Sequence, residues 1–265
     1  MGARRLFLSF ALLALALPVA GAQVVRQPGR TLAAEGDSVM HSKDRDELVF
    51  HWELWHLSDG SYEAVDRSAY NKSLVETYRF DREFMPLGYT LQYDSPGKST
   101  GAQDLKYSIS CQYEPRKLRC AESDGGRNSE ATIAAEPPFV CVGKFYGYDF
   151  LWLMTGVVRL AAQENPKGGN VNTYDWTEAK PDELGLEKEE RPMTISLAGE
   201  ETRDPKGAKV ALKLYQWDNG DDEEPRILSV DHHGMVVSLA QKSKLEAPMI
   251  TMENYKEYEP WAPRP

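Results

Sequence analysis

The segment Asp231-His232-His233-Gly234 holds the only adjacent pair of histidines in the chain, directly after a carboxylate. Imidazole and carboxylate groups are the ligands that zinc takes in proteins. Apolar strands are expected on both sides, however, and Gly234 suits a positive φ, so the four residues also fit a β-turn. Adjacent residues of a strand point to opposite faces and chelate poorly unless the turn redirects them. The turn is the favoured interpretation, and no metal ligand is assigned.

Three other segments carry fragments of functional motifs. Ser95–Thr100 resembles the end of a phosphate-binding loop, but Gln92 stands where the motif needs glycine, and an alternating strand follows instead of a helix. Residues 218–224 have the acidic side chains of a calcium loop without its full spacing or terminal glutamate. His51 and His56 are an odd number of residues apart, which places them on opposite faces of a strand. We interpret Ser95–Thr100 as a hairpin loop and His51 and His56 as two separate histidines. Residues 218–224 are interpreted as an exposed acidic loop, with weak calcium binding as the alternative.

The sequence motifs of common enzymes are absent: there is no G-x-S-x-G, no H-E-x-x-H and no C-x-x-C. Glycoside hydrolysis by two carboxylates needs no local motif, and the 41 acidic residues do not single out a pair. No catalytic residue and no cofactor is therefore assigned, and a hydrolase acting on glycans stays open as an alternative.

The first 22 residues have the three parts of a cleavable signal peptide. Arg4 and Arg5 precede an apolar run over 6–19, and Ala20-Gly21-Ala22 supplies the small residues of a cleavage site. The run is short for a permanent anchor, and no later stretch reaches the roughly 20 apolar residues of a spanning helix. The mature chain is expected to be periplasmic or secreted, without an integral membrane segment.

The chain is acidic, with a formal charge of −10 that becomes −12 once Arg4 and Arg5 are removed. A negative surface repels phosphate backbones and anionic headgroups. Nucleic acid and anionic lipid surfaces are therefore disfavoured as partners.

Three cysteines remain after export: Cys111, Cys120 and Cys141. In an oxidising compartment a pair is expected to form a disulfide and leave one thiol. If Pro115 and Arg116 are the central residues of a hairpin turn, Cys111 lies directly opposite Cys120 at a separation that suits a disulfide. We therefore predict the Cys111–Cys120 bridge; Cys120–Cys141, or three unpaired thiols, are the alternatives.

Hydrophobic patterning divides the mature chain into five parts. Residues 23–45 are polar and predict a lead-in without regular structure. Residues 46–254 predict a single β-rich domain, because apolar and polar residues alternate along most of it. Within that domain, apolar residues recur at helical spacing over 148–163, whereas 164–191 is rich in Gly, Pro and charge and predicts a long loop. The tail at 255–265 is rich in proline.

Clean alternation predicts antiparallel strands with one buried and one wet face. The helical segment is apolar nearly all round, so it needs cover on several sides. The predicted fold is mainly β, a curved antiparallel sheet or open barrel wrapped around one apolar helix.

The C-terminal hairpin places the turn 231–234 between the apolar strands 227–230 and 235–239. This element order, over roughly 46–254, resembles the periplasmic lipoprotein-carrier half-barrels (LolA/LolB-like) and related exported domains. The resemblance implies a binding or carrier protein for an apolar ligand, such as a lipid or lipid-linked group, with no chemistry of its own. The long loop at 164–191 departs from that pattern and puts direct transfer of the carrier role in doubt.

Aromatic and methionine side chains gather on the apolar faces, where they suit either a plain core or the lining of an apolar cavity. The candidate ligand-binding residues are Trp52, Tyr89, Tyr93, Tyr107, Phe150, Trp152 and Met154. The leading hypothesis is a non-enzymatic exported protein that binds a hydrophobic ligand or an envelope partner. A secreted hydrolase and a structural or assembly factor are the alternatives.

Overall fold

The computed structural model describes most of the chain after its first 25 residues. The described residues are 26–43, 45–71, 73–95, 105–142, 151–180, 183–189, 192–203, 210–218, 224–245, 247–259 and 261. The signal peptide predicted at 1–22 lies outside them. Within them, no helix combines the length and the apolar character that crossing a membrane requires.

The described residues form mainly β-strands. The strands are β1 (Arg26–Gln27), β2 (Arg30–His41), β3 (Asp46–Leu57), β4 (Tyr62–Ser68), β5 (Leu74–Phe80), β6 (Pro86–Ser95), β7 (Leu105–Glu114), β8 (Lys117–Asp124), β9 (Arg127–Ala134), β10 (Phe139–Cys141), β11 (Gly168–Lys180), β12 (Glu183–Lys188), β13 (Met193–Arg203), β14 (Val210–Asp218), β15 (Arg226–Val230), β16 (Val236–Gln241) and β17 (Ile250–Glu257). The helices are α1 (Leu151–Ala162) and the short 3-10 helix η2 (Lys242–Lys244).

These strands make one large, curved sheet that does not close. One half is a meander from β2 to β9, and the other runs from β17 back through β16, β15, β14 and β13 to β11. The halves join where β17 pairs with β2, with Thr251 opposite Val39. The pairs are antiparallel except that of β10 with β11. The predicted curved antiparallel sheet is therefore confirmed.

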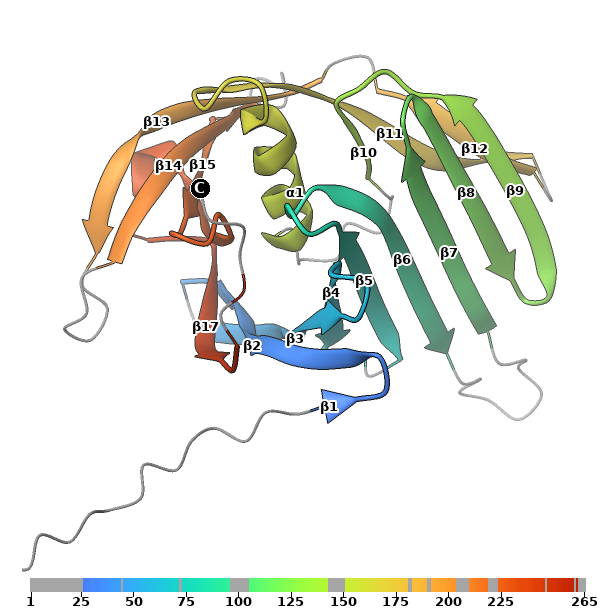
Figure 1. Ribbon diagram of the computed structural model, residues 1–265, viewed down its shortest axis with the longest axis horizontal. Coiled ribbons are helices and arrows are strands. Elements are labelled where there is room, and N and C mark those ends of the chain that lie inside the picture. The colour runs from blue at the N-terminus through green and yellow to red at the C-terminus, as the bar shows by residue number, and fades with distance from the viewer. Residues whose placement is uncertain are drawn as a thin grey trace, which may run out of the picture.

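Helix α1 lies inside the curve of the sheet (Figure 1). Trp152 faces an apolar cluster that includes Trp52 of β3 and Phe80 of β5. Met154 faces a second cluster, which includes Ile195 of β13 and Leu228 of β15. Because both sides of the helix are covered, its apolar surface is buried nearly all round, as predicted. The helix predicted over 148–163 runs over Leu151–Ala162 within the described residues.

The two outer ends of the sheet approach each other at β9 and β12, which lie side by side (Figure 1). Ala131 and Ile133 of β9 join the same apolar cluster as Leu184 and Leu186 of β12. Next to them, Glu136 forms an ion pair with Lys188. Side chains, rather than a described ladder of backbone hydrogen bonds, therefore hold this seam.

The segment 23–45 was predicted to be an irregular lead-in, and this is wrong for most of it, because β2 is a full strand between β3 and β17. Apart from Leu32, its buried positions hold small residues, among them Ala34, Gly36 and Ser38. The reason is the indole of Trp52, which crosses over β2: a Cβ at Gly36 would lie 2.5 Å from Trp52 Cζ2. Small residues leave room for the indole but carry too little hydrophobicity to show the alternation.

The segment 164–191 was predicted to be a long loop, and it instead contains β11 and β12. Several of the side chains that β11 buries are polar or amphipathic: Thr173, Tyr174 and Trp176. Its backbone is paired by β10, β12 and β13. Tertiary pairing therefore sets the conformation of residues whose composition is typical of loops.

The tail predicted at 255–265 is partly ordered as well. Strand β17 continues to Glu257, and Trp261 is buried against Phe84 and His233. The indole Nε1 of Trp261 donates a hydrogen bond to the Tyr255 hydroxyl at 2.9 Å. An aromatic residue among prolines thus fastens the end of the described chain to the domain.

Replacing Gly36 by alanine is expected to destabilise the protein by about 1–3 kcal/mol, since the new methyl group overpacks a filled core. The Cβ would meet both the Trp52 ring and, at 2.9 Å, the backbone oxygen of Glu253. Equilibrium unfolding in urea measures the change. Ser38→Ala on the same buried face is the matched control, because Ser38 Oγ has no hydrogen-bond partner among the described residues. Equal losses for the two variants would contradict the packing argument.

Candidate functional site

Five of the seven candidate ligand-binding residues lie together between α1 and the concave face of the sheet. Trp52, Tyr89 and Trp152 are buried members of one cluster, and Tyr93 and Tyr107 pack against it. The rings of Trp52 and Trp152 meet edge to face, with their centroids 5.5 Å apart. Mutually packed aromatic rings of this kind make a core. Their role as ligand contacts stays a prediction.

The other two candidate residues do not join this group. Met154 lies on the opposite side of α1, in the second cluster. Phe150 lies outside the described residues, as do 96–100 of the loop that resembles a phosphate-binding motif and 219–223 of the acidic loop.

A pocket of about 470 Å³ opens beside the C-terminal end of α1. Its apolar wall includes Leu87, Pro115, Phe139 and Leu160, which come from β6, the β7–β8 turn, β10 and α1. The lining also includes polar residues: Glu114, Gln163, Glu164, Asn165 and Asn170. The volume is in the range of small-molecule sites. A lining that is partly apolar and partly polar suits a ligand that has an apolar body and a polar end.

A second hollow, of about 400 Å³, lies between β1 and the β3–β4 turn. It is lined by polar residues that include Arg26, Arg30 and His56. The apolar pocket beside α1 is therefore the better match for a hydrophobic ligand.

Two carboxylates face the interior of the sheet, and sequence reasoning did not find them. Asp66 of β4 lies directly opposite Glu76 of β5. Both side chains are fully buried. The Tyr78 hydroxyl donates a hydrogen bond of 2.7 Å to Glu76 Oε2, and burial raises the pKa of Tyr78 well above its ordinary value. A pair closed off from water in this way has no path for a polymeric glycan substrate.

The alternation of β4 and β5 was the signal that could have found this pair. The inward positions of β4 are Tyr62, Ala64, Asp66 and Ser68, and those of β5 are Leu74, Glu76, Tyr78 and Phe80. The inward face of each strand therefore contains one carboxylate among its other residues. Only the register of β4 against β5 shows that Asp66 and Glu76 lie opposite each other.

The cysteines lie together in the same cluster. Cys111 and Cys120 form the predicted disulfide, and they stand opposite each other across β7 and β8 as the hairpin register required. Cys141 is a buried thiol whose Sγ lies 3.7 Å from that of Cys111. Burial raises the pKa of Cys141 far above its usual range. A thiol that stays protonated is a poor nucleophile, which keeps the bridge in place.

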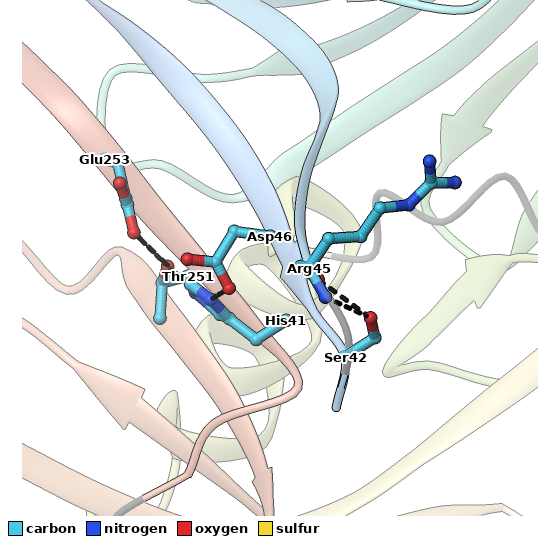
Figure 2. Close-up of polar contacts among 6 residues, drawn as sticks. All are labelled: His41, Ser42, Arg45, Asp46, Thr251 and Glu253. Atoms are coloured by element: carbon cyan, nitrogen blue, oxygen red, sulfur yellow. Dashed lines mark hydrogen bonds and ion pairs between the residues drawn. The ribbon is translucent and has the colours of Figure 1, made fainter.

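A carboxylate, an imidazole and a hydroxyl line up where the β2–β3 turn meets β17 (Figure 2). His41 Nδ1 lies 2.8 Å from Asp46 Oδ1, and Nε2 lies 2.7 Å from Thr251 Oγ1. This is the connectivity of a catalytic triad. The Thr251 hydroxyl, however, donates to Glu253 at 3.2 Å, and the Asp46 side chain is 71% exposed. Because the Thr251 hydroxyl directs its proton to Glu253, the geometry does not set up transfer of that proton to the imidazole. The group fastens β17 to the β2–β3 hairpin.

The segment Asp231–Gly234 forms the predicted turn, between β15 and β16. Gly234 has a φ of 78°, and its backbone N–H donates to the Asp231 carbonyl at 2.9 Å. Asp231 Oδ1 accepts from the backbone N–H groups of His233 and Met235. Burial raises the pKa of Asp231 and lowers that of the neighbouring Arg159.

No match is found for this chain among known protein families, curated proteins or solved structures.

Replacing Tyr78 by phenylalanine is expected to destabilise the protein by about 1–3 kcal/mol, because a buried acceptor loses its donor. Urea unfolding of the variant measures the loss. Tyr89→Phe is the matched control: Tyr89 is equally buried, packs on Tyr78 at 5.0 Å, and its hydroxyl has no hydrogen bond among the described residues. A loss for Tyr89→Phe as large as that for Tyr78→Phe would contradict this role of the hydrogen bond.

The Cys141 thiol is expected to resist iodoacetamide in the folded protein at mildly alkaline pH, since burial keeps it protonated and out of reach. Unfolding without reductant should then expose one reactive thiol per chain, and mass spectrometry of the peptides should place the label on Cys141. A label on Cys111 or Cys120 would show that the disulfide is different.

Proposed function

We propose that this protein is an exported, non-enzymatic binding or carrier protein, and that its ligand is a lipid or a lipid-linked group. The observation that most supports this proposal is the apolar pocket beside α1. In this proposal, residues 1–22 are the signal peptide that directs export. The Cys111–Cys120 disulfide supports an oxidising compartment.

The shape and the chemistry of the pocket support an amphipathic ligand. Leu87, Phe139 and Leu160 would contact its apolar chain, and the amide groups of Asn165 and Asn170 stand where a polar end would lie. The resemblance to the lipoprotein-carrier half-barrels supports the same class of ligand. The negative charge of the chain argues against recognition of an anionic headgroup by general attraction.

The hydrolase alternative has less support. Asp66 and Glu76, which oppose each other across β4 and β5 on the concave face, are closed to water. Glycoside hydrolysis needs two carboxyl groups that flank an accessible substrate bond. A structural or assembly factor would need no pocket at all.

Native mass spectrometry of the mature protein, purified from its own compartment, tests the proposal directly. We expect an adduct of one apolar ligand per chain, which organic extraction removes and lipid analysis identifies. An apo mass, combined with no binding of a fluorescent long-chain fatty acid by the purified protein, would contradict the carrier proposal.

The variant Leu87→Glu places the site of binding. Leu87 lines the pocket and is 37% exposed, so a carboxylate is tolerated by the fold but faces the ligand chain. We expect binding of the fluorescent fatty acid to weaken by about tenfold, or about 1.4 kcal/mol. Leu48→Glu is the matched control, because Leu48 is 43% exposed on β3 and is not part of the pocket. Equal weakening in both variants would place the ligand elsewhere.

A further inference from the structure

The turn between β15 and β16 brings three metal-ligand side chains together. One ligand atom each from Asp231, His232 and His233 lies within 4.8 Å of the others. The imidazole centroids of the two histidines are 3.8 Å apart. On a straight strand the two rings would point to opposite faces. The turn removes that obstacle, because it redirects both rings to one side of the backbone.

A further carboxylate lies beside His233 and comes from a different strand. Glu257, near the end of β17, has Oε2 at 3.7 Å from His233 Nε2, which is too long for a hydrogen bond. The His233 side chain is only 11% exposed, and its Nε2 has no hydrogen-bond partner among the described residues. A buried nitrogen in this condition costs free energy unless something binds it. A cation between His233 and Glu257 would satisfy both groups.

The surroundings hold this turn in place from three directions. Arg159 of α1 donates to the backbone oxygen of His233, and Thr155 Oγ1 accepts from the backbone N–H of Val236 at 3.0 Å. The indole of Trp261 stacks on the His233 ring with centroids 4.9 Å apart. Ligands whose positions are fixed before the metal arrives lose little conformational entropy on binding.

We propose that Asp231, His232 and His233 form a binding site for a divalent first-row transition metal such as Zn²⁺. Two imidazoles and one carboxylate make a three-ligand set of the kind that zinc takes, with a fourth position for water. The carboxylates of Asp231 and of the nearby Glu257 offset the charge of the metal beside the guanidinium of Arg159. His232 is exposed and leaves a path from solvent to the site.

The metal would bind where parts of the chain that are distant in sequence meet. Its ligands belong to the β15–β16 turn, which is bonded to α1 and has Glu257 of β17 beside it. Binding to the folded state alone raises the free energy of unfolding through mass action. The site would therefore act as a clamp between the helix, the hairpin and the last strand, separate from the apolar pocket.

Isothermal titration of the mature chain with Zn²⁺, carried out without a polyhistidine tag, tests this proposal. We expect one equivalent to bind, the thermal midpoint to rise, and EDTA to reverse both changes. His232→Gln removes an exposed ligand with little effect on folding, and His233→Gln removes the buried one. Each should weaken binding by on the order of 100-fold. Co²⁺ in place of Zn²⁺ should give a visible spectrum typical of a tetrahedral site.

His56→Gln is the matched control, because His56 stacks on Tyr62 in another part of the sheet. Its affinity for Zn²⁺ should equal that of the unmodified chain. Circular dichroism and the metal-free urea midpoint show whether each variant is folded. The proposal is overturned if the unmodified chain binds no Zn²⁺ at millimolar concentration. It is also overturned if a folded His232→Gln variant binds as tightly as the unmodified chain.

Discussion

A helix that is apolar nearly all round has to be enclosed, and this constraint shapes the whole molecule. No single flat layer can cover α1, because a flat sheet contacts only one side of a helix. The sheet therefore curves until its strands face opposite sides of the helix. The cluster around Trp152 draws on the β2–β9 meander together with β10, β11 and β12, and the cluster around Met154 draws on β10, β11 and the strands from β13 to β17. The pairing of β17 with β2 is what joins the halves into a single wall.

The enclosure of the helix also determines which residue types occupy particular positions of the sheet. Trp152 projects from α1 toward β3 and needs a large partner, which is Trp52. The indole of Trp52 in turn takes the space over β2, so Gly36 stands there. A tryptophan and a glycine that are 16 positions apart in the sequence are thus two parts of one packing arrangement, and both follow from the position of the helix.

The architecture could be predicted because alternation and helical spacing are strong signals. The strands β6 and β7 and the helix α1 carry apolar residues at clean periods. The strands β2 and β11 could not be predicted in this way. In β2, small residues replace aliphatic ones beneath Trp52, and in β11 buried Thr173 and Tyr174 weaken the contrast between the two faces. Their strand conformation depends on pairing with strands that are distant in the sequence, and the hydrophobic pattern of a segment carries no information about such pairing.

The same distinction, between local patterns and contacts distant in the sequence, applies to the candidate site. The Cys111–Cys120 bridge followed from a short hairpin whose register is set by its own turn. The aromatic residues were found because they are apolar and repeat on one face. The opposition of Asp66 and Glu76, the approach of Glu257 to His233, and the pocket formed by several separate elements all require the complete topology. Local patterns predict elements, whereas sites are made where distant elements meet.

The place of β17 in the sheet has a consequence for how the chain reaches its folded form. The meander from β2 to β9 consists of neighbouring hairpins, each of which closes a short loop and can form as soon as its residues are available. The opposite edge of β2, however, waits for the last strand of the chain, more than 200 residues later. Until synthesis is nearly finished, β2 has an unpaired edge and Trp52 lacks part of its cover. The domain is therefore completed late and from its C-terminal end, and a chain that stops before β17 would keep an open edge on which other strands can pair.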